Sequence, residues 1–486
     1  MATVSSLGIG SGLDLNSLLA NIKSAEQAPL VALQQQQRSY TSKLSAYGQL
    51  SSALSALQTA AAALAKPALY TGVKATSSAT DVLTASALAT AASGSYALNV
   101  TQLTQAQSLA AAGVASTTTA IGGGAATTVT LDFGTISGGT LDPATGKYTG
   151  ATFTADGTRT ATSITIDPAN NTLAGIRDAI NASTAMGVTA SIVNDGSATP
   201  NRLVLTSKQS GETSSMRIAV TGDAAVSSLL ANDPAATQNL QQTAVAQNTK
   251  LTVNGIAITS ASNTVAGAIQ DVTMTVAKVG TSTLSVQNDT ASVQSAVTGF
   301  VNAYNSLQGV AKQLTAFDAS RKSGAVLMGD STLRNIQVRI RSALTTAQAD
   351  GGSGLTMMSQ IGISFQKDGT LAIDSTKLTA ALGSKLSGVA NLFSGASGVG
   401  GYGTQMSSLL TGFTDSSGTL TSATKGINTS LDSLGKQYSA MSERIDATVA
   451  RYKAQFNQLD VMMSGMSRTS SYLTQQFDAL NNTRKN

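Results

Sequence analysis

The chain of 486 residues contains no cysteine, no histidine and no tryptophan, and only 11% of its residues are charged. Without histidine there is no imidazole base near neutral pH and no Ser-His-Asp triad. Without cysteine or histidine, the usual ligand sets of zinc, haem and iron–sulfur clusters are missing as well. Disulfides are impossible, so cysteine usage does not distinguish a cytosolic protein from an exported one. We therefore expect no enzyme, no cofactor and no metal site.

Three short motifs resemble catalytic or phosphate-binding loops but lack residues that the chemistry needs. Gly8 and Gly10 begin like a dinucleotide-binding loop, but Leu13 takes the place of the last glycine and no strand has room to precede them. The "TGKYT" segment (145–149) lacks the hydroxyl residue after the lysine of a P-loop. The "DFG" at Asp132–Gly134 resembles a kinase motif, but a chain without histidine has no His-Arg-Asp loop. We expect a strand that passes into a turn there.

Long hydrophobic runs and concentrated positive charge are also missing. No segment reaches the roughly 18 consecutive apolar residues of a membrane span, and the N-terminus lacks the pattern of a secretory signal. The formal net charge is +5, yet lysine and arginine are scattered and aromatic residues make up 4%. The densest basic stretch, with Arg334, Arg339 and Arg341, is interpreted as a solvated helix face. We expect neither membrane insertion nor nucleic-acid binding.

The C-terminal segment carries a long helical repeat of apolar residues. All six prolines lie at or before Pro234, and proline breaks helix interiors, so the second half suits long helices. The repeat alternates steps of three and four residues, apart from one 4,4 break at Met441–Ile445–Val449 and a polar Ser470. It predicts a heptad seam for another helix; the alternative is an amphipathic helix packed on its own domain. Its members are Ile427, Leu431, Leu434, Tyr438, Met441, Ile445, Val449, Tyr452, Phe456, Leu459, Met463, Met466, Leu473, Phe477 and Leu480.

A matching repeat near the N-terminus predicts the partner helix. Pro67 ends this run, and Pro29 separates it from a shorter apolar stripe for which Asp14 is the expected N-cap. Short helices alone are marginal in water, so we expect both terminal segments to be mobile until a partner covers them. The longer run comprises Tyr40, Leu44, Tyr47, Leu50, Leu54, Leu57, Ala61 and Leu64, and the shorter one Leu15, Leu18, Leu19 and Ile22.

The middle of the chain, from about 76 to 286, is predicted to form strands and turns. Alternating apolar residues flank Asn254-Gly255, which favours a type I′ hairpin. A helix with Leu173, Ile176 and Ile180 on one face is expected to end at Gly187. A strand then leads to a turn at residues 194–196. The helical parts on either side of this β region are expected to pack together.

Several segments resemble one bacterial protein family. They include "SSLGIGSGLDLNSLLANI" (5–22), "VNGIAITSASNTVAGAIQDVTMTV" (253–276) and "RYKAQFNQLDVMMSGMSRTSSYLTQQFDAL" (451–480). With "LMGDSTLRNIQVRIRSAL" (327–344) and "IGISFQKDGTLAIDSTKL" (361–378), the chain resembles the flagellar filament cap proteins, hook-associated protein 2. The unit at 164–206 resembles an insertion motif shared with flagellins.

This resemblance implies an α+β, multidomain fold in which inserted β-rich domains interrupt a helical leg domain with coiled-coil-like terminal segments. The expected parts are a mobile N-terminal coil segment (1–40), a helical leg domain (41–75 and 286–425), a β domain (76–120 and 240–285), an inserted β-rich domain (121–239) and a C-terminal coiled-coil segment (426–486).

The resemblance also implies a function and partners. Family members form a homo-oligomeric ring, of five subunits or nearly so, at the distal tip of the extracellular filament. The ring promotes folding and insertion of exported flagellin and prevents its loss. Hook–filament junction proteins and a cytoplasmic export chaperone are further implied partners. Export through the flagellar type III apparatus uses no cleaved signal peptide.

Site residues follow from the apolar stripes and the resemblance together. Contacts with filament subunits are expected from Leu15, Leu18, Leu19, Ile22, Tyr452, Phe456, Leu459, Met463, Phe477 and Leu480. Chaperone binding is expected from Phe456, Leu459, Met463, Leu473 and Phe477. Two alternatives stay open at this point: a hook–filament junction protein or minor filament subunit, and a surface adhesin that presents its β domains.

Overall fold

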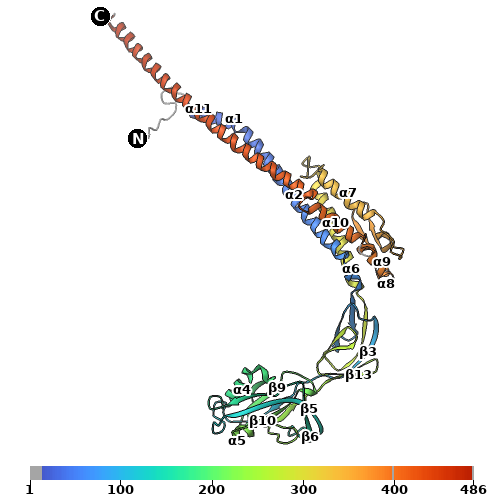
Figure 1. Ribbon diagram of the computed structural model, residues 1–486. Coiled ribbons are helices and arrows are strands. Elements are labelled where there is room, and N and C mark those ends of the chain that lie inside the picture. The colour runs from blue at the N-terminus through green and yellow to red at the C-terminus, as the bar shows by residue number, and fades with distance from the viewer. Residues whose placement is uncertain (1–13, 397–398, 484–486) are drawn as a thin grey trace. The chain divides into compact units, whose positions relative to one another are not determined.

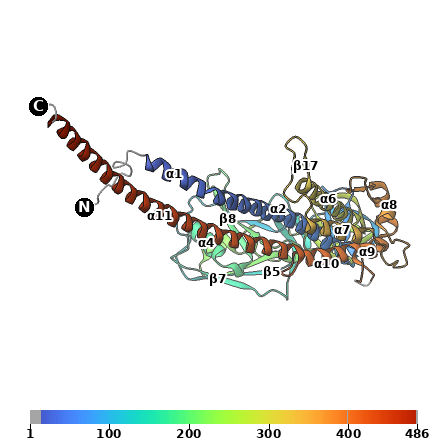
Figure 2. The same ribbon diagram turned by 90° about the horizontal axis from the view of Figure 1, so that it is seen from above.

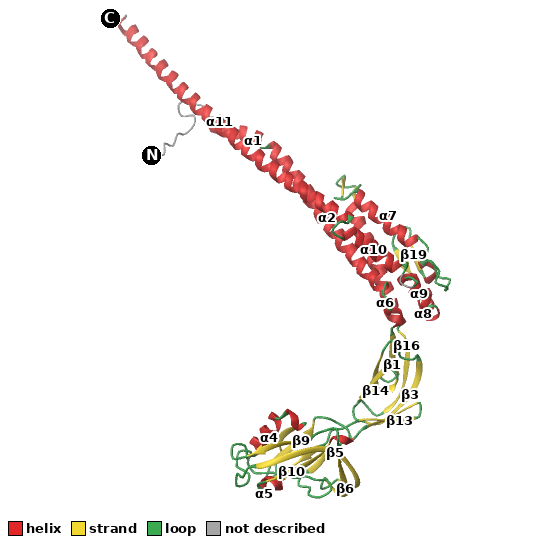
Figure 3. Ribbon diagram, in the orientation of Figure 1, coloured by secondary structure: helices red, strands yellow, loops and turns green. Residues whose placement is uncertain are grey.

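The computed structural model describes residues 14–396 and 399–483, which form two compact units (Figure 1). One unit joins the chain up to Tyr70 with the chain from Thr290 onward, and the other spans Thr71–Asp289. Helices dominate the first unit and strands the second (Figure 3). This confirms the predicted α+β class and the insertion of β-rich structure into a helical body. The finer domain limits stay predictions, and the motif at Gly8 and Gly10 lies outside the described residues.

The helical unit is built from helices of very different length. Short strand pairs, β17 (Phe317–Asp318) with β18 (Ser323–Gly324) and β19 (Ile363–Phe365) with β20 (Leu371–Ile373), connect some of them. The helices are α1 (Leu15–Glu26), α2 (Ala28–Leu64), α3 (Ala68–Thr71), α6 (Thr290–Thr315), α7 (Ser331–Thr345), α8 (Ser375–Ser384), α9 (Leu386–Ser394), α10 (Tyr402–Thr414) and α11 (Thr419–Thr483).

Helix α2 is central to this unit because it contacts α6, α10 and α11. Pro29 stands in its first turn, where a missing backbone N–H costs nothing, and so separates α2 from α1 as predicted. Its buried face contains Tyr47, Leu50, Leu54, Leu57, Ala61 and Leu64, all members of the predicted repeat. These side chains pack with α6 residues such as Phe300 and Tyr304 in one continuous core. Each large apolar side chain buried there contributes about 1.5–3 kcal/mol.

A polar contact ties α2 to the start of α7. Asp330 is the N-cap of α7, and its Oδ1 accepts a hydrogen bond from the Leu333 N–H at 2.9 Å. The other carboxylate oxygen accepts a hydrogen bond from the Tyr47 hydroxyl at 2.8 Å. One carboxylate therefore caps one helix and anchors another, although the two helices are far apart in sequence.

The β unit contains two apolar cores. The first lies between a five-stranded sheet, in the order β1-β16-β3-β12-β13, and a three-stranded sheet, β14-β15-β2. All neighbouring strands in these sheets are antiparallel. The bounds are β1 (Val73–Ser77), β2 (Leu83–Ala87), β3 (Gly94–Gln102), β12 (Thr249–Val253), β13 (Ile256–Ser260), β14 (Thr264–Ile269), β15 (Val272–Val276) and β16 (Gly280–Asn288).

The second core is formed by the residues between β3 and β12. Strand β5 pairs with β10, β6 and β7, and a separate sheet has the order β11-β4-β9-β8. Helix α4 contacts β8, and α5 contacts β10. The bounds are β4 (Ser108–Ala110), β5 (Thr127–Asp142), β6 (Lys147–Ala155), β7 (Thr162–Ile166), α4 (Leu173–Ala182), β8 (Val188–Asn194), β9 (Asn201–Ser207), β10 (Ser215–Thr221), α5 (Ala224–Leu230) and β11 (Gln241–Ala244).

Local predictions in the β unit had mixed outcomes. The hairpin is confirmed: Asn254 and Gly255 join β12 to β13 with φ of 49° and 84°, as a type I′ turn requires. Leu173, Ile176 and Ile180 are the buried face of α4. The predicted end at Gly187 is wrong, because α4 stops at Ala182 and Gly187 closes a separate 3₁₀ turn. The turn expected after Asp132–Gly134 is also wrong, because β5 continues to Asp142 in register with β6.

The Tyr47 contact predicts how the helical unit responds to alkaline pH. Burial, together with the hydrogen bond to Asp330, raises the pKa of Tyr47 from 10.0 to about 12. A raised folded-state pKa adds stability that is complete below the unfolded pKa and disappears as pH rises through the folded one. We expect Tyr47→Phe to lower the free energy of unfolding by about 0.5–1.5 kcal/mol at about pH 8. The variant should then lose less stability than the wild type between pH 10 and about 12.

Urea denaturation followed by far-UV circular dichroism measures both effects. Tyr472→Phe, which removes an exposed hydroxyl, is the matched control. An equally steep loss of stability in Tyr47→Phe and in the wild type would contradict the assignment.

Candidate functional site

The N-terminal helices α1 and α2 pack along the C-terminal helix α11. Helix α2 contacts α11 over many residues, and α1 contacts it as well; both helices lie beside α11 in Figures 1 and 2. The Gln34 side-chain amide donates a hydrogen bond to the Tyr438 hydroxyl at 3.2 Å. Gln36 lies near Gln437, and Lys43 near Thr429, so the two helices run antiparallel. The prediction that the helical ends pack together is confirmed.

The first part of α11 is covered and its distal part is not. Ile427, Leu434 and Ile445 are buried, the last with 3% of its surface exposed. Farther along the same repeat, Phe477 and Leu480 are each 62% exposed. In Figures 1 and 2, α11 continues well past the start of α1. The described part of the seam therefore has a covering helix within the chain for only part of its length.

Helix α1 begins with the predicted cap. The Asp14 carboxylate accepts hydrogen bonds from the Ser17 hydroxyl and the Ser17 N–H, and these bonds lower the pKa of Asp14. Leu15 is 2% exposed and packs within the chain, whereas Leu18 is 46% exposed. Leu19 and Ile22 are half-buried. Of the four α1 residues expected to contact the filament, Leu18 presents the most accessible side chain.

The distal part of α11 carries an apolar surface, here called the distal stripe. From Tyr452 to Leu480 its members recur at steps of three and four, apart from the slot that Ser470 fills, and they span about 42 Å at 1.5 Å per residue. The rings of Tyr452 and Phe456 stack with centroids 6.3 Å apart. These two side chains are half-buried, whereas the others are exposed. The stripe comprises Tyr452, Phe456, Leu459, Met463, Met466, Leu473, Phe477 and Leu480.

The exposed apolar surface of α11 is wider than the residues predicted as contacts. Met466 occupies a position of the repeat but was not among the predicted contacts. Val461, Met462 and Tyr472 lie outside the seam and are also largely exposed. The available signal was the density of apolar residues in 459–466, which exceeds what a two-residue heptad seam needs. The structure brings all predicted C-terminal contact and chaperone residues onto one helix.

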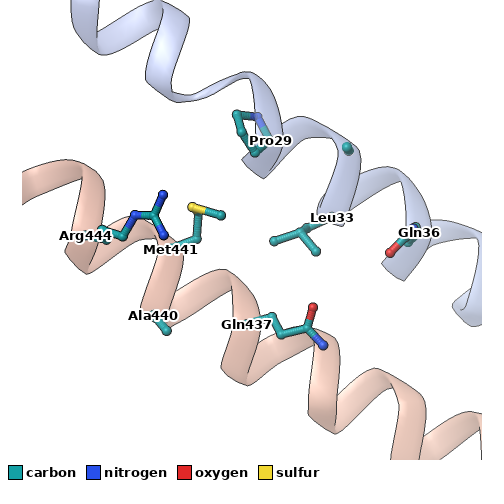
Figure 4. A pocket seen from close by; sticks show the side chains of 8 residues that line it. Pro29, Leu33, Gln36, Gln437, Ala440, Met441 and Arg444 are labelled. Atoms are coloured by element: carbon teal, nitrogen blue, oxygen red, sulfur yellow. The ribbon is translucent and has the colours of Figure 1, made fainter.

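A groove interrupts the packing of α2 against α11. It has a volume of about 450 Å³ and is lined by Pro29, Ala32, Leu33, Gln36, Gln437, Ala440, Met441 and Arg444. Figure 4 shows Leu33 of α2 and Met441 of α11 directed into it from opposite sides. Met441, which lines the groove, is also the first residue of the 4,4 step at Met441–Ile445–Val449.

The basic stretch on α7 has an intramolecular role. The Arg339 guanidinium lies 5.1 Å from the centroid of the Phe413 ring, and that of Arg341 lies 5.5 Å from the centroid of the Phe365 ring. Both cations thus stack on aromatic rings of their own unit. The interpretation of this basic stretch as a purely solvated helix face is incomplete. The sequence alone did not show that these aromatic rings lie beside the arginines.

The described part of the chain has neither a carboxylate metal site nor a membrane-spanning helix. Across residues 14–396 and 399–483, no three or more carboxylates come together in a way that could hold a metal ion. Within those same residues, no helix combines the length and the apolar character that crossing a bilayer requires. The most prominent surface is therefore the distal stripe. Such a surface, on a helix anchored at one end, is typical of proteins that bind the apolar face of another helix.

Comparison with known proteins identifies the family. Models of the flagellar hook-associated protein 2 N-terminus and C-terminus match residues 11–107 and 246–468, and a flagellin hook IN motif matches 152–209. Flagellar hook-associated protein 2 of Escherichia coli (strain K12) is 40% identical over the full length of both chains. The Salmonella typhimurium protein of that name is 39% identical over 99% of this chain and 100% of its own.

A solved structure agrees with this assignment. The D1-D2-D3 domains of the Escherichia coli flagellar cap protein FliD match with a TM-score of 0.60 and 37% identity, over 79% of this chain and 99% of that one. The chain belongs to the flagellar hook-associated protein 2 family. The resemblance seen in the sequence is confirmed, including the flagellin-type insertion motif.

The uneven cover of α11 predicts uneven hydrogen exchange in the isolated protein. Backbone amides between residues 466 and 480 should exchange at least about tenfold faster than those between 427 and 445, because unpacked helix is marginally stable in water. Hydrogen–deuterium exchange with peptide-level mass spectrometry measures this directly. Peptides from the buried face of α2 provide the slow reference. Equal protection along α11 would mean that another part of the chain covers the distal stripe.

Proposed function

We propose that this chain caps the flagellar filament by docking its distal stripe against filament subunits. Capping is the role of the family to which the chain belongs. The observation that carries the docking is a heptad-spaced apolar surface, exposed from Leu459 to Leu480 over about 32 Å of a helix whose other end is anchored in a packed unit. Only another apolar helix face of similar spacing buries such a seam efficiently. The proposed role is structural rather than catalytic.

The burial free energies favour an attachment that is strong as a whole but can be released one contact at a time. Burying one large apolar side chain contributes about 1.5–3 kcal/mol, and association consumes part of this gain. The six exposed members of the stripe can therefore support stable docking together but not singly: they are Leu459, Met463, Met466, Leu473, Phe477 and Leu480. Leu18 of α1 adds a further contact. A cap that must release one subunit and engage the next needs contacts that break one at a time.

The remaining features of the function are proposed by analogy with the family. Several copies of the chain form a ring of about five at the distal tip, where exported flagellin folds and is inserted rather than lost. Hook–filament junction proteins are further partners. The protein reaches the outside through the flagellar type III apparatus. Before export, a cytoplasmic chaperone covers Phe456, Leu459, Met463, Leu473 and Phe477, because an uncovered stripe of this length invites aggregation.

The alternative roles differ in where the protein is found. A junction protein or minor subunit would lie at the hook or along the filament, and an adhesin would use the β unit to bind surfaces. Immunogold labelling of intact flagella with antibody against residues 76–286 tests all three. We expect gold at the distal tip. Label at the hook junction, along the filament or on the cell body alone would contradict capping.

Charge placed on the distal stripe should stop filament growth. The double variant Phe456→Asp and Leu459→Asp puts two carboxylates where apolar contacts are proposed, so docking should fail and flagellin should be lost to the medium. Filament length by electron microscopy and secreted flagellin by immunoblotting measure this. The β unit should stay folded, because it shares no core residue with the stripe.

A matched control separates the stripe from a general effect of charge on α11. Ala454→Asp with Gln458→Asp adds the same charge to exposed positions on the opposite face of the helix. Filaments of normal length are expected from this control. Normal filaments from the stripe variant would refute the docking role.

A further inference from the structure

Three methionines lie within five residues on the distal part of α11. Met462, Met463 and Met466 are 63%, 37% and 62% exposed, and Met463 and Met466 belong to the distal stripe. Gly465, which precedes Met466, has no atom within 4 Å of the place where a Cβ would stand. These thioether side chains are therefore accessible to small molecules in solution.

Accessible sulfur is concentrated on this docking surface. The chain has no cysteine, so all the sulfur that an oxidant can reach belongs to methionine. Met328 and Met357 are also exposed, but both lie in loops outside α11. Five other methionines are buried, with at most 3% of their surface exposed: Met186, Met216, Met274, Met358 and Met406.

Oxidation would change the property on which docking depends. Methionine suits an apolar contact because its unbranched side chain adapts to irregular surfaces, whereas its sulfoxide is polar. A sulfoxide oxygen buried at the seam needs a hydrogen-bond donor, which an apolar partner face does not supply. Met463 and Met466 are three residues apart and so are neighbours on the helix surface. Two sulfoxides there oppose two adjacent contacts.

We propose that Met462, Met463 and Met466 form a reversible oxidation site that switches off docking of the distal stripe. The reactant is a peroxide: a lone pair of the sulfur attacks one peroxide oxygen, the O–O bond breaks and an S–O bond forms. With hydrogen peroxide, the second oxygen takes up the proton and leaves as water, so sulfur is oxidised and peroxide reduced by two electrons. Methionine sulfoxide reductases restore the thioether.

This site rests on the docking function proposed above. It concerns the chain before docking, because a partner helix on the stripe covers the same sulfurs. Attachment should therefore protect the cluster from oxidation, while the unattached protein stays sensitive.

Peptide mass spectrometry of the full-length protein after hydrogen peroxide treatment locates the oxidised sulfurs. The three clustered methionines should oxidise at least about tenfold faster than Met216 and Met274, because those two are fully buried. Equal rates at the clustered and the buried residues would overturn the assignment.

Filament growth then measures the effect of oxidation on docking. Protein that has been oxidised and freed of peroxide is added to flagellated cells lacking their own copy, and filament length is measured by electron microscopy. We expect the restored length to fall about tenfold or more relative to untreated protein. Treatment with methionine sulfoxide reductases for both sulfoxide epimers should recover it.

A triple variant assigns this effect to the cluster. Met462→Leu, Met463→Leu and Met466→Leu together remove the sulfurs and keep similar apolar volume. Each protein is compared with its own untreated sample. The triple variant should lose little on peroxide treatment, whereas Met328→Leu, which removes an exposed sulfur outside α11, should lose as much as the wild type.

Three outcomes would overturn the oxidation site: full restoration by the oxidised wild type, equal loss in the triple variant, or no recovery with the reductases. The last of these needs no variant. Failure of docking itself is seen separately, because it would show as normal filaments from the Phe456→Asp and Leu459→Asp variant without any oxidant.

Discussion

The burial of one face of α2 is the interaction on which the rest of the helical unit depends. Its leucines contact segments that come before and after a β unit of more than two hundred residues. The entropy of closing a long loop grows only slowly with length, so a large insertion costs little more than a short one. The N-terminal helix can therefore hold the C-terminal helices in place while the intervening chain folds into cores of its own. Loss of the α2 face would release α6, α10 and α11 together.

The apolar repeat on α11 is buried in one part and exposed in another. The lengths of α1 and α2 decide where the covered part ends. Where α2 runs beside α11, the apolar positions are buried or half-buried; beyond α1, residues of the same type and spacing are exposed. The groove at Leu33 and Met441 lies where the heptad phase shifts. Anchoring at one end and exposure at the other give α11 the form of a docking helix.

The β unit contributes a different kind of chemistry. Its strands are held by alternating apolar residues, and several of its few charged side chains form ion pairs, as in Arg217 with Asp132 or Arg202 with Asp195.

Much of this protein's structure could be predicted from the sequence alone, because composition, residue spacing and turn residues are local signals. The absence of histidine and cysteine excludes most catalytic and metal chemistry, heptad spacing predicts the terminal helices, and Asn254-Gly255 predicts a turn through its backbone conformation. Only the tertiary structure shows which apolar positions of the terminal helices are covered. Leu15 is buried against other parts of the chain, whereas Phe477, which is also apolar, is exposed. It also decided that Arg339 stacks on Phe413, that Tyr47 meets Asp330 and that β5 runs through Asp132–Gly134. These contacts join residues distant in sequence, and no local pattern contains information about them.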